Sequence, residues 1–234
     1  PEGEDDNPGT NELPWKSFKK AASTAKAGHT VIFEDGEYME TSISTFKSSG
    51  TQTAPIIFKA RNKHKAKIVF PASARMAVKI GLPLGKNYIT IQDFEITQIA
   101  TAQDEEAGNT RDIFIETYGN NNKFIGNKIH HCYEEGIKAA LTKNIHIEGN
   151  IIYDSTHEGV DFVNVENGII RDNDISEFGR VGIMLKGGVK NIKVYNNYVH
   201  SKDKVSRTLK PIGITVGGET NNSAPADIRV NTGF

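Results

Sequence analysis

The sequence predicts an all-β solenoid, a parallel β-helix of about 23 residues per coil that begins with a capping α-helix. The first observation behind this prediction is a short apolar pattern with a central asparagine that recurs along the chain. Its steps are 23, 23 and 24 residues, at Asn127, Asn150, Asn173 and Asn197. A fixed period in the low twenties is typical of chains in which one small unit stacks on the next.

The second observation is a row of glycines, each followed by isoleucine or valine. They stand at Gly136, Gly159, Gly182 and Gly213, so their steps are 23, 23 and 31 residues. The longer last step is consistent with an insertion of eight residues near 202–210. Two patterns with one shared period indicate coils built from short parallel strands joined by tight bends.

Composition limits the possible functions. The 234 residues carry a formal net charge of -1, so no overall field would attract nucleic acid. No run of 18 apolar residues is present, which argues against a membrane span. The single cysteine, Cys132, excludes an internal disulfide. We expect one domain over 1–234, secreted and monomeric, with Pro1 as a trimmed start and a solenoid that is incomplete at Phe234.

The first 28 residues are expected to close the end of the solenoid. Residues 1–14 are rich in turn formers and predict a loop. From 15 to 27 the apolar spacing becomes helical, with Trp15, Phe18 and Ala22 on one face and Gly28 as the C-cap. Such a helix would cover the exposed apolar end of the first coil.

Residues 29–234 are expected to form the coils. Strands are predicted at 30–33, 55–60, 67–70, 77–80, 88–96 and 112–116, with a loop at 98–111. Alternation points Val160 and Phe162 inward and Asp161 outward. The recurring asparagines are expected at bends, in the left-handed conformation, with side chains that bond to the coils above and below.

Residues one period apart become neighbours on adjacent strands, so outward positions form columns. One column is predicted to contain Lys138, Asp161, Met184 and Thr215. By the same rule Glu134 and Glu135 lie one coil below His157 and Glu158.

These residues could bind a hard cation. Carboxylates gathered on one patch favour Ca²⁺, which prefers several oxygen ligands. The candidate ligands are Glu134, Glu135, His157, Glu158 and Asp161, with Lys138 and Lys186 beside them. A solvated face with salt bridges between coils is the alternative interpretation. His157 has no second histidine in its column, which argues against zinc.

Two stretches carry a resemblance to a known family. The entry segment joins Asp6-Asn7-Pro8-Gly9-Thr10 to Gly28-His29-Thr30-Val31, and the second stretch is His157-Glu158-Gly159-Val160-Asp161. They resemble right-handed parallel β-helix proteins, and most closely the family 9 polysaccharide lyases, which include pectate lyases. The resemblance implies a Ca²⁺ site on the second stretch, completed by an acidic residue of the coil before.

The resemblance also implies a lysine base in the following coil. Met184 stands where the family has that lysine, and Lys186 lies two residues further on, so it stays on the outward face. Lys138 is the next candidate for the base. Arg180 and Arg171 are candidates to bind substrate carboxylates, although both also fit ordinary surface positions.

The leading hypothesis is therefore a secreted lyase that cleaves an acidic polysaccharide by Ca²⁺-assisted β-elimination. Three alternatives stay open: a glycoside hydrolase, a uronate epimerase, and a non-catalytic carbohydrate-binding or adhesion solenoid. The chain has no Gly-His-Gly segment, and its coils hold no Asp-Asp pair, which argues against a polygalacturonase-like hydrolase.

Overall fold

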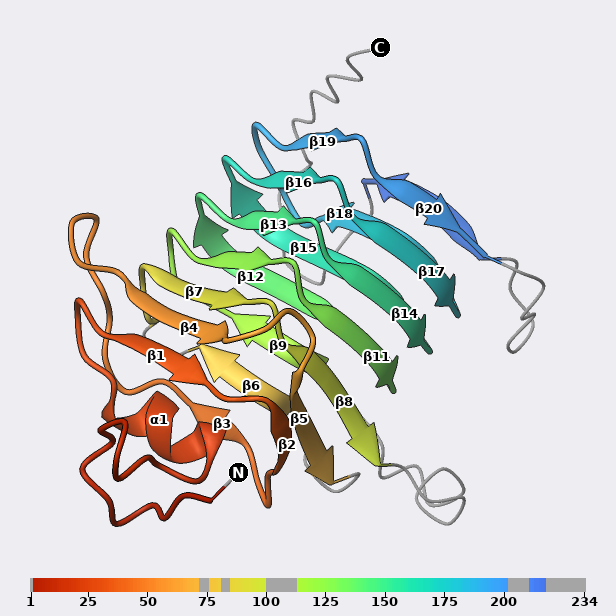
Figure 1. Ribbon diagram of the computed structural model, residues 1–234. Coiled ribbons are helices and arrows are strands. Elements are labelled where there is room, and N and C mark those ends of the chain that lie inside the picture. The colour runs from red at the N-terminus through yellow and green to blue at the C-terminus, as the bar shows by residue number, and fades with distance from the viewer. Residues whose placement is uncertain (1, 72–75, 81–84, 100–112, 202–210, 218–234) are drawn as a thin grey trace.

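The structure of the protein, a computed structural model, describes residues 2–71, 76–80, 85–99, 113–201 and 211–217. Three parallel sheets of seven strands each run along the molecule (Figure 1). The strand order in each sheet advances by one coil at a time, so the chain visits the three sheets in turn. The prediction of an all-β parallel β-helix with an N-terminal helix is confirmed.

The strands of the first sheet are three to five residues long. Its members are β1 (Thr30–Phe33), β4 (Ile56–Ala60), β7 (Ile89–Gln92), β10 (Lys123–Ile125), β13 (His146–Glu148), β16 (Ile169–Arg171) and β19 (Lys193–Tyr195). After a bend, each of these strands is followed by a strand of the second sheet. It contains β2 (Gly36–Met39), β5 (Ala66–Pro71), β8 (Glu95–Ile99), β11 (Lys128–Cys132), β14 (Ile151–Ser155), β17 (Asp174–Phe178) and β20 (Tyr198–His200).

The strands of the third sheet range from two to nine residues. It contains β3 (Ser44–Thr45), β6 (Met76–Ile80), β9 (Ile113–Thr117), β12 (Ile137–Lys143), β15 (Glu158–Glu166), β18 (Val181–Lys186) and β21 (Ile212–Val216). Here the glycine row has a steric cause. A Cβ on Gly159 would lie 2.8 Å from the carbonyl oxygen of Gly182, so only glycine lets the backbones stack this closely.

Asparagine side chains link the coils between the first and second sheets. The Asn127 amide nitrogen donates to Asn150 Oδ1 at 3.1 Å, Asn150 to Asn173 at 2.9 Å, and Asn173 to Asn197 at 2.8 Å. The predicted ladder is confirmed. The predicted left-handed conformation of these residues is wrong, because it is the residue before each asparagine that has a positive φ, as at Gly126 and Gly149.

A second asparagine column, which the sequence analysis missed, supplies left-handed positions elsewhere. Asn121, Asn144, Asn167 and Asn191 all have φ between 52° and 60°. The Asn144 side chain donates to Asn121 Oδ1 at 2.9 Å, and that of Asn191 donates to Asn167 Oδ1 at 3.2 Å. Asparagine tolerates this conformation better than most residues do, which explains its use at this bend.

Inward side chains stack in like-with-like columns. In the second sheet, fully buried isoleucines of successive coils pair directly, at Ile68, Ile96, Ile129, Ile152 and Ile175. Val160 and Phe162 are also fully buried, as predicted. β-branched side chains fit a pleated surface well, so each coil presents an apolar surface on which the next coil packs.

The helix α1 (Phe18–Thr24) closes the N-terminal end. Its Phe18 ring lies 5.3 Å from that of Phe33 and 5.2 Å from that of Phe58, centroid to centroid. The capping role is confirmed, but the helix is shorter than the predicted 15–27. Ser17 caps its start, and Ala25 leaves the helical conformation with ψ 140°.

Two further boundaries differ from the sequence prediction. Gly28 has a positive φ, but its amide donates to the carbonyl of Ala54 in the next coil, so it is no helix cap. The predicted strand 88–96 is two strands, β7 and β8, because Asp93 turns the chain with φ 64°. The short strands β2 and β3 were missed. The predicted insertion at 202–210 and nearly all of the predicted loop at 98–111 lie outside the described residues.

The asparagine ladder can be tested by Asn150→Ala. Asn150 is buried, and its side chain accepts from the Asn127 amide and donates to Asn173 and to the carbonyl of Phe124. We expect the free energy of unfolding to fall by about 3 kcal/mol, because several buried groups lose partners.

Urea denaturation measures this change. The control is Asn62→Ala, whose exposed side chain bonds to Asp35 and to no other described side chain, and which should change stability by less than about 0.5 kcal/mol. Equal effects of the two substitutions would show that the ladder does not stabilise the stack.

Candidate functional site

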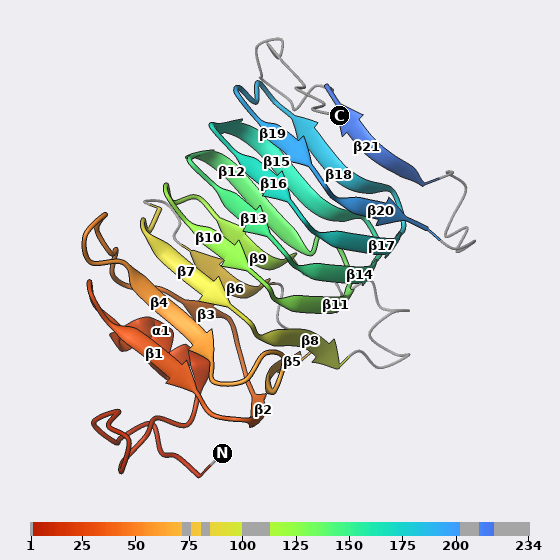
Figure 2. The same cartoon turned by 45° about the horizontal axis from the view of Figure 1, so that its top comes forward.

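The candidate site lies on the outer face of the third sheet. Strands β9, β12, β15 and β18 lie side by side there (Figure 2). Lys138 pairs in register with Asp161, Asp161 with Met184, and Met184 with Thr215. The predicted outward column is therefore confirmed, and stacking by one coil does bring these residues together.

Three carboxylates are buried on this face. Glu135 is 5% exposed, Glu158 1% and Asp161 0%. The Gly136 amide donates to the Glu158 carbonyl at 3.1 Å, which places Glu135 and Glu158 on adjacent coils. Asp161 was predicted to point outward. It does, but neighbouring side chains cover it completely.

Three cationic side chains pair with these carboxylates. Lys138 Nζ lies 2.9 Å from Glu135 Oε1 and 3.3 Å from Asp161 Oδ2. Lys186 Nζ lies 3.1 Å from the same Asp161 oxygen, and Arg180 Nε lies 3.8 Å from Glu158 Oε1. We call these six residues the charged cluster: Glu135, Lys138, Glu158, Asp161, Arg180 and Lys186.

The charged cluster has two layers. The carboxylate side chains are at most 6% exposed, whereas the two lysine side chains are 22% exposed and that of Arg180 is 51% exposed. The acids thus lie beneath and the cations above them. An anion that approaches this face meets ammonium and guanidinium groups first.

Burial sets the protonation of the cluster. It raises the pKa of Glu158 to about 6, and the charges of Glu135 and Asp161 add to this shift. Burial also raises the pKa of Asp161, although both lysines oppose the shift. Burial alone would lower the pKa of Lys138, but Glu135 and Asp161 outweigh it and raise that pKa above its ordinary value. Lys138 is therefore protonated at neutral pH.

The carboxylate oxygens fit a hard cation by their chemistry. Glu135 Oε2 and Asp161 Oδ1 accept no hydrogen bond from any described residue, and Glu158 Oε1 has only the 3.8 Å approach of Arg180. Ca²⁺ prefers such oxygens. Yet no group of three or more His, Cys, Asp or Glu side chains forms a ready-made metal site in the described residues. Asp161 Oδ2 is instead shared by two lysines.

The remaining predicted site residues lie around or away from the charged cluster. Glu134 is half-buried beside His157, whose backbone amide donates to the Glu134 carbonyl at 3.2 Å. Burial lowers the pKa of His157, and Arg180 adds to this, so the imidazole is neutral at pH 7. Arg171 lies on β16 of the first sheet, where it pairs with Glu148 at 2.5 Å. It is not part of the third sheet.

Glu116, on β9, was not predicted as a site residue. It pairs in register with Lys138 and is 3% exposed. Its Oε1 accepts a hydrogen bond from the Tyr118 hydroxyl at 2.7 Å, and its Oε2 lies 4.0 Å from Lys79 Nζ. Glu116 stands 22 residues before Lys138, about one period, which was the available signal. Lys79 stands 37 residues before Glu116, so no period indicated it.

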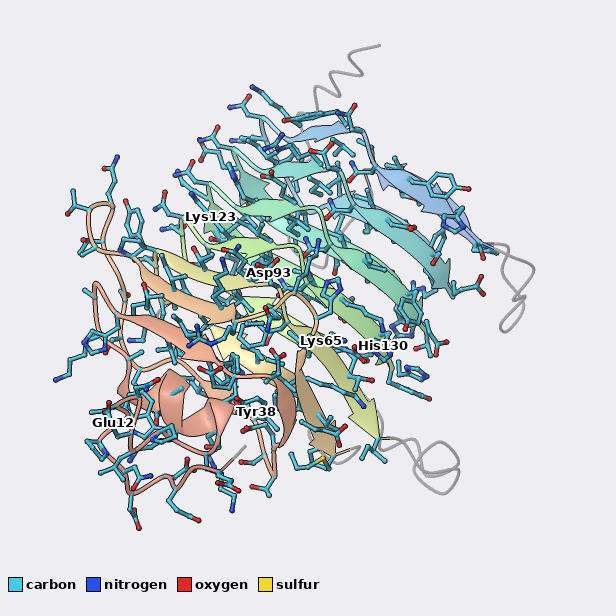
Figure 3. The ribbon with its side chains drawn as sticks, viewed as in Figure 1. Glu12, Tyr38, Lys65, Asp93, Lys123 and His130 are labelled. Carbon is cyan, nitrogen blue, oxygen red and sulfur yellow. The ribbon has the colours of Figure 1, made fainter. Side chains whose placement is uncertain are left out.

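Other reactive side chains lie elsewhere. His130 is on β11 of the second sheet (Figure 3). Its Nε2 lies 3.1 Å from Glu95 Oε1, and its ring is stacked on that of Tyr153. Cys132 on the same strand is buried, and burial raises the pKa of its thiol, consistent with the packing role that its position suggests.

The raised pKa of Glu158 predicts a dependence of stability on pH. Between pH 4.5 and 6 the unfolded state loses the Glu158 proton while the folded state keeps it. The free energy of unfolding therefore falls as the pH rises. Glu158→Gln should remove a penalty of about 2 kcal/mol at pH 7 and leave stability below pH 4.5 nearly unchanged.

Urea denaturation at pH 4 and pH 7 measures this difference between the variant and the wild type. The control is Glu34→Gln, because the Arg61 hydrogen bond lowers the pKa of that exposed carboxylate and should give the opposite sign. A Glu158→Gln protein that loses stability relative to wild type as the pH rises would contradict the assignment.

Known proteins resemble the chain in sequence and in fold. The uncharacterized protein YwoF of Bacillus subtilis (strain 168) is 42% identical over 59 residues, which are 25% of this chain and 12% of that protein. The pectate lyase PEL9 of Emericella nidulans is 38% identical over 60 residues, 26% of this chain and 15% of that protein. The matched segments thus span a small part of both relatives.

A solved structure of low sequence identity is similar to the chain in fold only. The complex of XylC with xylose has a TM-score of 0.52 at 13% identity, over 85% of this chain and 62% of that one. In the described part of the chain no helix is both long and apolar enough to cross a membrane.

Family models cover most of the sequence. Residues 84–224 match a model described as right handed beta helix region. Residues 1–148 match one described as Pel9A-like, right handed beta helix region. The latter covers more than half of the 234 residues, so the chain belongs to the Pel9A-like right-handed β-helix family.

Proposed function

We propose that this protein is a polysaccharide lyase that cleaves a uronate-containing glycan by β-elimination at the charged cluster. The observation that carries the proposal is the layering of that cluster, in which Lys138, Lys186 and Arg180 lie above three buried carboxylates. Membership in the Pel9A-like family and the similarity to a pectate lyase support it. A polymeric substrate also favours an extracellular location.

The reaction needs two kinds of group. The proton to be removed is on the carbon next to the substrate carboxylate, and that carboxylate accumulates negative charge as the proton leaves. Cationic groups that neutralise this charge stabilise the transition state. A base must take the proton, and a lysine side chain can do so only as the neutral amine. Lysine and arginine side chains on one face can supply both functions.

The two lysines are suited to different roles. Lys138 contacts both Glu135 and Asp161, and these carboxylates keep it protonated, so it can neutralise a substrate carboxylate but is a poor base. Lys186 contacts Asp161, its only ion pair among the described residues. We therefore assign the base to Lys186, which has to lose its proton and leave Asp161 before it acts.

Lys186 Nζ takes the proton, and the electron pair of the broken C–H bond forms a double bond to the neighbouring carbon. The bond from that carbon to the glycosidic oxygen breaks, and the leaving oxygen takes a proton from water. In this proposal Arg180, half exposed beside Glu158, binds a substrate carboxylate.

We also propose that Glu135, Glu158 and Asp161 hold Ca²⁺, with Glu134 and His157 at the edge of the site. Bound Ca²⁺ would supply the Lewis-acid neutralisation of the substrate carboxylate that elimination needs. The free oxygens of the three buried carboxylates support the proposal. Because lysine ammonium groups already contact Asp161, Ca²⁺ and these lysines should compete for it.

The activity is tested with polygalacturonate, alginate and glycosaminoglycans, each with Ca²⁺ or a chelator. We expect ultraviolet absorbance from an unsaturated product on a uronate polymer, lost on chelation. Lys186→Ala should lower kcat by a factor of about 100 or more, because the base is removed. The matched control is Lys143→Ala, an exposed lysine of β12 paired with Glu166, which should leave the rate unchanged.

The other outcomes have distinct meanings. New reducing ends without the absorbance would indicate a hydrolase, and a changed sugar configuration without cleavage would indicate an epimerase. Binding without any product would indicate a carbohydrate-binding solenoid. Full activity of Lys186→Ala would make the base assignment wrong, and Lys138 would then be tested in the same way.

A further inference from the structure

Two consecutive histidines lie on the outer face of the second sheet, a different sheet from that of the charged cluster. Consecutive residues of a strand ordinarily point to opposite faces. In β11 this alternation is interrupted, because His131 has a left-handed backbone with φ 59°. Ile129 and Cys132 are both buried in the core, which leaves the two residues between them on the outer face (Figure 3). We call His130 and His131 the histidine pair.

The two rings meet through their Nδ1 atoms. His130 Nδ1 lies 2.5 Å from His131 Nδ1, and the Thr97 hydroxyl oxygen lies 3.3 Å from the same His130 nitrogen. Each ring also has its Nε2 near a carboxylate of a neighbouring coil. His130 Nε2 lies 3.1 Å from Glu95 Oε1, and His131 Nε2 lies 3.6 Å from Asp154 Oδ2.

The surroundings of Glu95 fix the tautomer of His130. Burial would raise the pKa of Glu95, but the hydrogen bond from His130 and the charge of Lys128 outweigh it and lower that pKa, so the carboxylate is ionised at neutral pH. An ionised carboxylate only accepts, so His130 Nε2 carries the proton that it donates. Burial lowers the pKa of His130, which keeps the imidazole neutral at pH 7. His130 Nδ1 therefore presents a lone pair to its neighbour.

That lone pair points at a second ring nitrogen, and such a contact needs a proton or a metal ion between the two atoms. The Nδ1–Nδ1 distance is shorter than an ordinary hydrogen bond from a nitrogen donor. Tetrahedral Zn²⁺ with bonds of 2.0–2.1 Å would place two ligand nitrogens about 3.4 Å apart, so the rings would have to separate by about 0.9 Å. The His131 side chain is 57% exposed, which gives its ring room to move and gives water access to the remaining coordination positions.

We propose that the histidine pair binds a divalent transition-metal ion, Zn²⁺ or Cu²⁺, through its two Nδ1 atoms. Glu95 and Asp154 are positioning residues, because a carboxylate on the far nitrogen orients a ligating imidazole and raises its basicity. Water completes the coordination, so no group of three or more His, Cys, Asp or Glu side chains is needed, and the described residues contain none. Imidazole suits these metals, whereas Ca²⁺ prefers oxygen ligands. The site does not depend on the proposed lyase activity.

Isothermal titration calorimetry with Zn²⁺ at neutral pH tests the proposal, with excess Ca²⁺ present to compete at the carboxylates of the charged cluster. We expect the wild type to bind one zinc ion per chain. His131→Asn removes one ligand, and asparagine tolerates the left-handed backbone at this position, so binding should weaken about tenfold or more. The matched control is His146→Ala, a histidine of β13 in the first sheet, which should leave the affinity unchanged.

Two further measurements separate a metal site from a structural contact. Glu95→Gln should weaken Zn²⁺ binding about tenfold, as expected when the carboxylate behind a ligating histidine is lost. Electron paramagnetic resonance of the Cu²⁺-loaded protein should show two nitrogen ligands in the wild type and one in His131→Asn.

Circular dichroism checks that each variant is folded, and His130→Gln replaces His131→Asn if the latter is not. A wild-type protein that binds no Zn²⁺ in excess Ca²⁺ would overturn the proposal, as would a His131→Asn protein that binds Zn²⁺ as tightly as wild type does. Either result would mean that the two rings share a proton and hold no metal.

Discussion

Stacking by one coil is the constraint on which the rest of the structure depends. Every strand finds its hydrogen-bonding partner one coil away, and the asparagine ladder from Asn127 to Asn197 keeps the coils in register between two of the sheets. A slip of one residue would turn apolar side chains outward and charged ones inward. The ladder and the glycine column prevent this by different means, one through hydrogen bonds and the other through a backbone approach that admits no side chain.

The same stacking gathers residues that are scattered in the sequence into the charged surface of the third sheet. Charged side chains separated by one coil become neighbours. Because the charges alternate in sign along the column from Lys79 to Asp161, adjacent side chains attract each other. Burial of the acids has two consequences. It keeps the cations in place above them, and it raises the pKa of Glu158 to about 6. Burying the carboxylates lowers the stability of the fold, but it leaves the cations on the outside. The third sheet therefore presents positive charge locally, although the protein has almost no net charge.

Most of the fold could be predicted from the repeat period, because every coil repeats the same inward positions. It also placed Asp161 next to Lys138, and Glu135 next to Glu158. The period could not predict how deeply an outward side chain is buried. Asp161 lies on the outward face but is fully covered, since the long side chains of adjacent coils fold over it, and no pattern of residue types encodes that. Glu116 was missed although it stands about one period before Lys138, whereas Lys79 was missed because its 37-residue distance from Glu116 hides the period. Tight bends such as Asp93 are set by backbone conformation, for which aspartate is a weak signal.

The central claim is that the cations above the buried acids contact the carboxylates of an acidic glycan. A crystal structure of the protein soaked with hexagalacturonate under chelating conditions, where cleavage should be slow, tests it most directly. We expect sugar carboxylates within hydrogen-bonding distance of Lys138 and Arg180, on the outer face of the third sheet. Sugar bound only over the first or second sheet would contradict it.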